Sequence, residues 1–352
     1  ILRSSVYQLK YMDHVPDSAV CNEAVKLAGK KGFVNLKGFV NGVLRNISRN
    51  PDMVSYPDPS NEIACLSVRY SLPMWMVEKW ISVYGKETVE KMGKAFLEER
   101  PVTVRRNTAV VSKEEFEKEL EKDGVVYRRH PVLPYAYELT NYDYLAGLLA
   151  FQKGYFYIQD ISSMQVAEWA EPKEGDYVID VCAAPGGKSL HAAGLLKEGN
   201  VISRDLTDSK TALIEENSRR CNCPNIRIET FDALEPDENM IGKADVVYAD
   251  LPCSGLGILG KKRDIRYRMN PEQMEELVEL QQKILSVIWQ YLKPGGTVIV
   301  NTQRILPMPV ITGATAYPDD PLASLAPYRV ESADALGIAV ECGSQKALNL
   351  VL

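Results

Sequence analysis

The sequence has few of the residues that build metal sites or disulfide scaffolds. Only three histidines, His14, His130 and His191, occur among its 352 residues, and its seven cysteines show neither zinc-site nor disulfide-framework spacing. No apolar run approaches the length that spans a membrane. We therefore expect no metal site, no membrane attachment and a reducing, cytoplasmic compartment.

Two phosphate-binding patterns are also incomplete. A P-loop requires G-x-x-x-x-G-K-[ST]; Gly187-Lys188-Ser189 fits its end, but Cys182 stands where the first glycine belongs. The dinucleotide pattern G-x-G-x-x-G is missing from the same stretch, residues 177–189. These departures weaken the case for a bound triphosphate, although a P-loop-type nucleotide-binding protein is kept as a less favoured alternative.

Composition is that of an ordinary globular chain. Hydrophobic residues make up 45% and charged residues 25%, and the length allows two or three domains with a sizeable core. The net charge of -6 argues against a protein that coats nucleic acid indiscriminately, but it is compatible with a local basic groove. The chain begins at Ile1, already in a helical pattern, so we expect an upstream segment to precede it.

The stretch 177–189 has the pattern of a buried strand that runs into a glycine turn and then a helix. Val178, Ile179 and Val181 form a β-branched apolar run of strand length. Gly186 and Gly187 allow a backbone to approach a ligand where a Cβ would collide, and the following helix supplies unpaired N–H groups. This arrangement predicts a site for a small nucleotide-like molecule.

Three further short strands end at or just before an aspartate: Asp205, Asp232 and Asp250. In a doubly wound α/β fold the carboxyl ends of parallel strands border one crevice, so these side chains are expected to line it. A row of carboxylates suits a ribose, an adenine amino group and a cation better than a triphosphate. Asp250 is ambiguous, because P-loop ATPases also hold magnesium with an aspartate after an apolar strand.

Four motifs occur in an order that resembles the S-adenosylmethionine-dependent RNA cytosine-C5 methyltransferases of the Nol1/Nop2/Sun family. They are Asp-Val-Cys-Ala-Ala-Pro-Gly-Gly-Lys at 180–188, Arg204-Asp205, Asp232-Ala233, and Asp-Leu-Pro-Cys-Ser-Gly-Leu-Gly at 250–257. The likeness runs from residue 1 to residue 300 and is strongest to bacterial members that methylate 16S ribosomal RNA. Amino-methyltransferases are a weaker match, since they carry [DN]-P-P-[YFW] where this chain has Asp-Leu-Pro-Cys.

The resemblance implies an α/β protein with an all-α domain in front. Residues 1–50 correspond to part of a NusB-like helical RNA-binding domain, 60–135 to a small α/β RNA-recognition module, and 136–300 to a doubly wound, Rossmann-like methyltransferase domain. Residues 301–352 do not resemble the family's closing elements and form an unassigned tail.

The periodicity predicts local structure within these segments. Helices are expected over 1–12, 18–28 and 33–48. Residues 1–50 as a whole contain eight Lys/Arg against three acids. In the module, strands over 101–108 and 125–129 flank a helix over 112–122. A strand over 154–160 is expected to enter the first helix of the methyltransferase domain, and Asn270-Pro271 to cap a helix with an apolar stripe.

Basic side chains in two places are candidate RNA contacts, which would position backbone phosphates without reading sequence. The module carries arginines next to its strands, including Arg128 and Arg129, and the run 261–268 has five cations, one acid and an interleaved tyrosine. The residues expected to bind RNA are Arg105, Arg106, Lys261, Lys262, Arg263, Arg266 and Arg268. The implied partner is 16S ribosomal RNA, and the protein is expected to be a monomer.

The implied cofactor is S-adenosylmethionine. Residues expected to bind it are Cys182, Ala183, Ala184, Pro185, Gly186, Gly187, Lys188, Asp205, Asp232 and Asp250. Carbon 5 of cytosine becomes nucleophilic once a thiolate adds to carbon 6, so this chemistry requires a cysteine near the crevice. Cys253, in the turn after Asp250, is the expected catalytic residue, and the target base must leave its stack to reach it.

The sequence departs from the family at one position that matters for this chemistry. The resemblance implies two cysteines. The one that matches Cys253 assists product release, and the nucleophile belongs to a Thr-Cys dipeptide where this chain has Thr302-Gln303. Glutamine cannot add to a pyrimidine. Three explanations are open: a tail from a shifted frame or misjoined gene, which we favour; Cys253 acting as nucleophile itself, as in DNA cytosine methyltransferases; or an inactive RNA-binding protein that kept the fold.

Overall fold

The computed structural model describes residues 1–51, 56–196, 199–301, 328–334, 337–342 and 345–351. These residues form two compact units, Ile1–Gly93 and Lys94–Leu352. Within the described ranges, no helix is long and apolar enough to cross a membrane.

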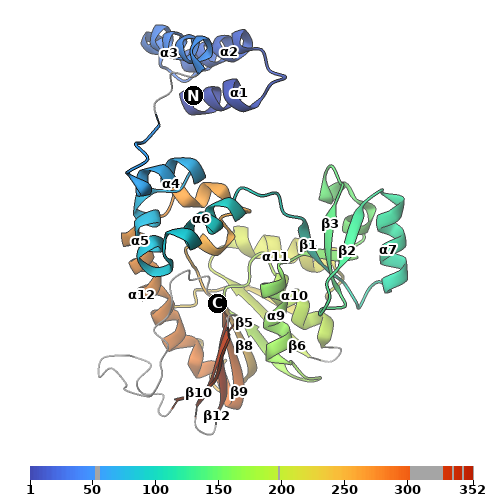
Figure 1. The fold of residues 1–352 in the computed structure, drawn as a ribbon. Coiled ribbons are helices and arrows are strands. Elements are labelled where there is room, and N and C mark those ends of the chain that lie inside the picture. The colour runs from blue at the N-terminus through green and yellow to red at the C-terminus, as the bar shows by residue number, and fades with distance from the viewer. Residues whose placement is uncertain (52–55, 197–198, 302–327, 335–336, 343–344, 352) are drawn as a thin grey trace. The chain divides into compact units, whose positions relative to one another are not determined.

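The first unit begins with the three helices that the sequence predicted. These are α1 (Leu2–Tyr11), α2 (Asp17–Lys30) and α3 (Lys37–Arg49) (Figure 1). A small apolar core joins them, formed by Cys21, Ala24, Ala28, Val40 and Leu44. The third helix begins later than expected, at Lys37, after a single 3-10 turn over Val34–Leu36.

Three more helices complete this unit: α4 (Glu62–Tyr70), α5 (Met74–Tyr84) and α6 (Lys86–Ala95). Trp80 is buried in their core. Gly93 is required where α6 meets the ring of Tyr70, because a Cβ there would lie 2.4 Å from the ring carbon Cγ.

The second unit opens with a four-stranded antiparallel sheet in the order β2-β3-β1-β4. Its strands are β1 (Val102–Arg106), β2 (Val126–Arg129), β3 (Ala136–Thr140) and β4 (Phe156–Ile158). Helix α7 (Lys113–Lys122) packs on it and is capped by Ser112, whose hydroxyl accepts a hydrogen bond from the Glu115 amide. This sheet with its helix is the small module.

The strand expected over 154–160 forms as β4 and belongs to the sheet of the small module, where it pairs antiparallel with β1. It still leads directly into α9 (Ile161–Ala170), as expected. Strand pairing depends on contacts distant in sequence, which the local pattern does not contain.

The large sheet contains the parallel strands that the sequence predicted. They are β5 (Tyr177–Asp180), β6 (Asn200–Asp205), β7 (Ile226–Thr230), β8 (Ala244–Asp250) and β9 (Leu292–Asn301). Beyond β9, the backbones of β12 (Gln345–Val351), β11 (Gly337–Cys342) and β10 (Tyr328–Asp334) extend the sheet, so strands occur within the segment left unassigned.

Helices cover both faces of this sheet, which confirms the doubly wound α/β class (Figure 1). Helices α9 and α10 (Gly187–Leu195) pack on one face and α12 (Pro271–Ile288) on the other. Asn270 caps α12 in a reciprocal capping box with Gln273, with Pro271 at the first helical position. Helix α11 (Asp208–Arg220) joins β6 to β7.

Strand β5 lies between β6 and β8 in the order β9-β8-β5-β6-β7. The chain therefore moves in one direction from β5 to β7 and then returns to the other side of β5 for β8. A crevice opens at the carboxyl ends of two strands where the winding reverses in this way. The candidate site is at this reversal.

Candidate functional site

The turn between β5 and α10, residues 182–187, is called the glycine loop below. Backbone and side-chain hydrogen bonds fix it to the end of β6. The Ala183 amide donates to the Arg204 carbonyl at 2.8 Å, and the Ala184 amide donates to Oδ2 of Asp205 at 2.9 Å. Two consecutive backbone groups are thus held by neighbouring residues of one strand.

Both glycines of this loop meet a steric requirement. Gly186 has a φ of 103°, a conformation that side chains with a Cβ rarely adopt. A Cβ on Gly187 would lie 2.9 Å from Cε1 of Tyr157, closer than normal contact. The loop therefore has no Cβ at these two positions to block close approach to its backbone, as the sequence predicted.

Lys188 and Asp250 form an ion pair at the edge of the crevice. Lys188 follows the glycine loop and its side chain is 9% exposed, while Asp250 ends β8 and is 35% exposed. Because the pair is partly withdrawn from water, its attraction is screened less than that of a surface pair. It joins the start of α10, the helix that follows β5, to the end of β8.

A cleft of about 860 Å³ runs from this ion pair to the small module. Six residues expected at the cofactor site line it: Ala183, Ala184, Pro185, Gly187, Lys188 and Asp250. The opposite walls come from segments 98–103, 157–160 and 260–263. Of the other described residues that were predicted, Cys182, Gly186, Asp205, Asp232 and Cys253 are not part of its lining.

The remaining aspartates occupy different environments. Asp205 is buried, and besides the Ala184 amide its carboxylate accepts from the Leu206 amide at 2.8 Å and pairs with Lys210 at 2.9 Å. Much of its acceptor capacity therefore holds the protein itself together. Asp232 is half-buried and its Oδ1 caps the turn by accepting from the Leu234 amide.

Asp180 is a site residue that the sequence analysis did not single out. It is fully buried beneath the glycine loop, at the end of β5, and Oδ2 accepts from the Ser189 hydroxyl at 2.7 Å. Burial raises the pKa of this carboxyl to about 7. An aspartate that ends an apolar strand directly before the loop was the available signal.

The two cysteines of the site differ in their chemistry. Burial, reinforced by nearby carboxylates, raises the pKa of the Cys182 thiol to about 12, so it stays protonated at neutral pH. Cys253 is half-buried in the turn after β8. That turn is anchored by Gln281 of α12, whose Nε2 donates to the Pro252 carbonyl at 2.7 Å. Only Cys253 of the two is a candidate nucleophile.

Two of the residues predicted to contact RNA have buried side chains. Arg105 is 6% exposed, and its Nε donates to Oε1 of Gln159, the residue after β4, at 2.7 Å. Arg266 is 2% exposed, and Nη2 donates to the Leu259 carbonyl. Neither guanidinium can reach a phosphate on the surface in this structure.

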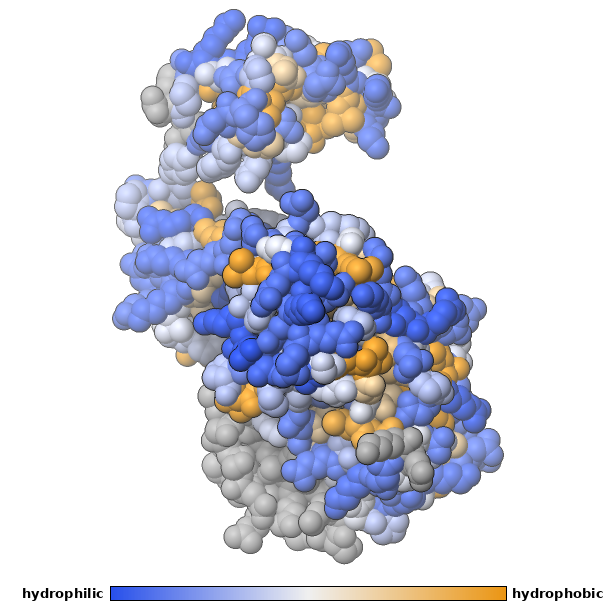
Figure 2. Space-filling view, turned by 90° about the vertical axis from the view of Figure 1, so that its right-hand side faces the viewer, coloured by the Kyte–Doolittle hydropathy of each residue, from blue (hydrophilic) through white to orange (hydrophobic). Residues whose placement is uncertain are grey.

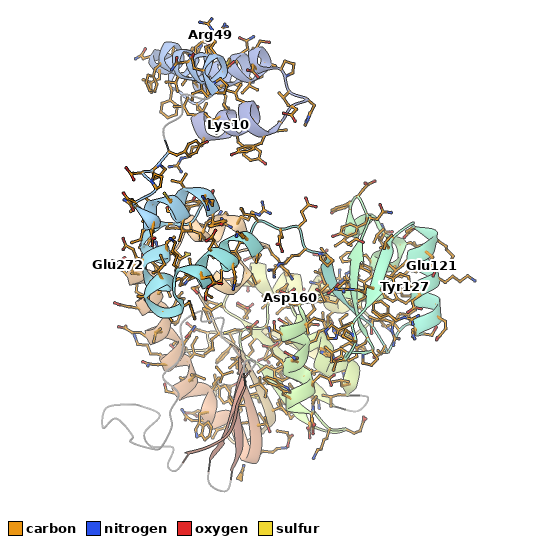
Figure 3. All side chains as sticks on the ribbon, viewed as in Figure 1. Lys10, Arg49, Glu121, Tyr127, Asp160 and Glu272 are labelled. Atoms are coloured by element: carbon orange, nitrogen blue, oxygen red, sulfur yellow. The ribbon has the colours of Figure 1, made fainter. Side chains whose placement is uncertain are left out.

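The other basic residues reach the surface to different degrees. Arg106 is half-buried, and its Nη1 donates to the Val111 carbonyl at 2.6 Å. Lys262 and Arg263 are exposed. Lys261 pairs with Asp160, which lies where β4 passes into α9 (Figure 3). Polar residues cover much of the face seen in Figure 2, with hydrophobic residues in small patches among them.

Further basic residues are held in ion pairs. Arg268 pairs with Asp264 at 3.0 Å. Arg128 and Arg129 of the module, both exposed, pair with Glu138 and Glu117. Gln303, at the position where the family resemblance expects the nucleophile, lies outside the described residues. In the ranges that are described, no group of three or more histidine, cysteine, aspartate or glutamate side chains is placed to hold a metal.

Three family models match the chain. The model described as 16S rRNA methyltransferase RsmB/F matches residues 167–309. The NusB family model matches 1–49, and the ferredoxin-like domain of RsmF/B-like methyltransferases matches 72–143. The match to 167–309 contains the glycine loop, the ion pair of Lys188 with Asp250, and Cys253.

Similar proteins agree with these matches. The probable ribosomal RNA small subunit methyltransferase B of Bacillus subtilis (strain 168) is 37% identical over 306 residues, which are 86% of this chain and 68% of the relative. The crystal structure of PH0851 matches with a TM-score of 0.77 at 25% identity, covering 86% of this chain and 68% of that one. NSun6 from Pyrococcus horikoshii, determined with SFG, matches with a TM-score of 0.57 at 25% identity, covering 62% and 80%.

The relative from Bacillus subtilis is similar over most of both chains, and the segment matched by the methyltransferase family model contains the glycine loop and the ion pair. This chain therefore belongs to the 16S rRNA methyltransferase RsmB/F family.

Proposed function

We propose that the chain binds S-adenosylmethionine at the glycine loop and that its site is built to methylate carbon 5 of a cytosine in 16S ribosomal RNA. The observation that carries the proposal is the ion pair of Lys188 with Asp250, beside the loop where β5 and β8 diverge. The glycine loop and the N-terminus of α10 lie next to this ion pair, and the chain belongs to the RsmB/F family.

The residues present fit this cofactor. The φ of Gly186 and the absence of a Cβ at Gly187 leave backbone available for a nucleoside ligand. Asp205 keeps part of its acceptor capacity after bonding the Ala184 and Leu206 amides and the Lys210 ammonium group, and this part is proposed for a ribose hydroxyl. Asp232, after β7, is proposed for the adenosine portion. The similar NSun6 structure contains SFG, an analogue of S-adenosylmethionine.

The reaction divides into steps that protein groups can promote. A cysteine thiolate adds to carbon 6 of cytosine, which makes carbon 5 nucleophilic. S-adenosylmethionine held at the glycine loop would supply the methyl group for carbon 5 and would leave as S-adenosylhomocysteine. A base then removes the carbon 5 proton, and the carbon–sulfur bond breaks to return the thiolate.

Asp250 is proposed to orient the target base. Its carboxylate lines the cleft and can accept a hydrogen bond from the exocyclic amino group of cytosine. Lys188 offsets its charge from the other side. Cys253, three residues further along the chain, is proposed to assist product release or to act as the nucleophile itself.

RNA contacts are proposed at the exposed cations beside the cleft. Lys262 and Arg263 reach solvent next to the cleft wall formed by 260–263. Phosphate contacts there would hold the RNA while the target base leaves its stack. We further propose that the protein works as a cytoplasmic monomer on 16S ribosomal RNA.

We propose that turnover is impaired in this chain, because Gln303 occupies the position of the family nucleophile. An inactive RNA-binding protein with a methyltransferase fold is therefore the second candidate. A P-loop-type function is disfavoured because Cys182 replaces the first glycine of that pattern.

Titration calorimetry tests the cofactor. We expect heat of binding with S-adenosylhomocysteine and none with magnesium-ATP. The opposite result would favour a P-loop-type nucleotide-binding function. A filter assay with tritiated cofactor and undermodified small-subunit RNA then separates an active enzyme from a protein that only binds RNA.

A further inference from the structure

One strand of the small module reaches the glycine loop. By strand alternation, Phe156 enters the core of the module, whereas Tyr157 points the other way and packs against Leu190 of α10 and against Cys221. Tyr157 is 6% exposed and also lines the cleft. The module thus contributes a side chain to the neighbourhood of the loop, although its sheet is separate from the large sheet.

The phenol makes a specific contact with the loop. The Tyr157 hydroxyl donates to the carbonyl oxygen of Pro185 at 3.0 Å. The same carbonyl accepts from Nδ2 of Asn217 on α11 at 3.1 Å. Burial raises the pKa of the phenol to about 12, so the hydroxyl keeps its proton at neutral pH. The small module and α11 therefore both hold the glycine loop by hydrogen bonds to the Pro185 carbonyl.

The position of Tyr157 is itself fixed by the contact between the module and the end of α11. Nδ2 of Asn107 donates to the carbonyls of Gly154 and Cys221, at 3.1 and 2.8 Å. Nη1 of Arg220 donates to the carbonyls of Phe151 and Phe156, each at 3.0 Å. These bonds connect backbone on both sides of the junction, so β4 and α11 hold Tyr157 and Asn217 in register.

From this geometry we infer that Tyr157 is a positioning residue for the cofactor: it holds the glycine loop in its binding conformation through the Pro185 carbonyl. The small module then supports cofactor binding as well as RNA recognition. The inference rests on the proposed function for the identity of the ligand, but the contact with the loop can be tested without any ligand.

The test compares Tyr157→Phe with Tyr155→Phe. Both variants lose only a hydroxyl, and Tyr155 donates to the exposed side of the module, to Oε1 of Glu115 at 2.9 Å. Loss of one buried hydrogen bond is expected to weaken S-adenosylhomocysteine binding about fivefold in Y157F and not in Y155F. An unchanged dissociation constant for Y157F, or equal weakening in both variants, would overturn the inference.

Hydrogen exchange distinguishes failure of this inference from failure of the proposed function. In the protein without cofactor, Y157F is expected to speed exchange of the amides in 183–187, because the loop opens more often. Unchanged exchange rejects the role of Tyr157. Faster exchange in a protein that gives no heat with S-adenosylhomocysteine keeps the role of Tyr157 and rejects the proposed ligand.

Discussion

The ammonium group of Lys188 and the carboxylate of Asp250 form an ion pair between the start of α10 and the end of β8. Lys188 is nearly buried, so a change of Asp250 leaves the ammonium group without this partner in poor contact with water.

Replacing Asp250 with Asn is expected to lower the free energy of unfolding by about 3 kcal/mol, the usual cost of leaving a buried charge without its partner. The matched control is Glu279→Gln, which breaks an exposed pair with Lys283 at 3.9 Å on α12 and should change little. Urea unfolding of both variants measures the difference. Equal midpoints would show that the pair at the crevice is no stronger than a surface pair.

Gly154 is predicted to be intolerant of any side chain. A Cβ there would lie 1.9 Å from the carbonyl oxygen of Arg220, so Gly154→Ala should cost more than about 3 kcal/mol of stability. Gly242 has nearly the same backbone angle, with φ 67° against 69°, but nothing lies within 4 Å of its Cβ position. Gly242→Ala should therefore cost only about 1 kcal/mol, as measured by urea unfolding. A similar loss in both variants would assign the effect to the backbone angle alone.

Asp180 is predicted to make stability depend on pH. Its pKa is raised to about 7 by burial, so folding favours the protonated form. The resulting penalty is absent below the unfolded pKa, grows as the pH rises toward 7 and is constant above it. The Asp180→Asn variant lacks this penalty. The difference in free energy of unfolding between the variant and the wild type should therefore grow in favour of the variant by roughly 2 to 3 kcal/mol from pH 5 to pH 8. Thermal unfolding of both proteins across this range is the measurement; parallel curves would contradict the prediction.

The chain is predicted to bind S-adenosylhomocysteine without transferring methyl groups, because Gln303 cannot form the adduct. Tritium incorporation into undermodified small-subunit RNA is the measurement, with Cys253→Ala as the partner variant and Cys65→Ala of α4 as the control. Incorporation that disappears only in C253A would make Cys253 the nucleophile. Incorporation that survives C253A would require a different group for the chemistry.

Lys262 is predicted to contact an RNA phosphate. Lys262→Ala should weaken binding of a 16S RNA fragment and reduce the slope of log K against log salt by about 1, as expected for one lost phosphate contact. Lys283→Ala, on the exposed surface of α12, removes the same charge and should leave the slope unchanged. An identical change in both variants would indicate a general effect of net charge.

The sequence predicted the large sheet and the glycine loop because their signals are local. Val178 and Ile179 mark a buried strand, and the glycines that follow are required by sterics that the structure reproduces at Gly186 and Gly187. The α/β class and the position of Asp250 in the cleft were predictable for the same reason.

Side chains at the junction of the small module could not be predicted in this way. Arg105 alternates along β1 as a surface arginine would, but it is buried and bonded to Gln159, which follows β4. Tyr157 belongs to a strand whose partner, β1, lies about fifty residues earlier in the chain. Local periodicity contains no information about either contact.

The cleft is shared between segments distant in sequence, and this limits how the protein can be divided. The match to the methyltransferase family model starts at residue 167, but the wall opposite the glycine loop comes from 98–103 and 157–160. A fragment cut at that boundary would keep every motif of the enzyme class and lose the tyrosine that secures Pro185. Such a fragment would lack one wall of the cleft, and the loop at the proposed cofactor site would lose its contact with the module. A shortened version of this protein should therefore keep the small module together with the large sheet.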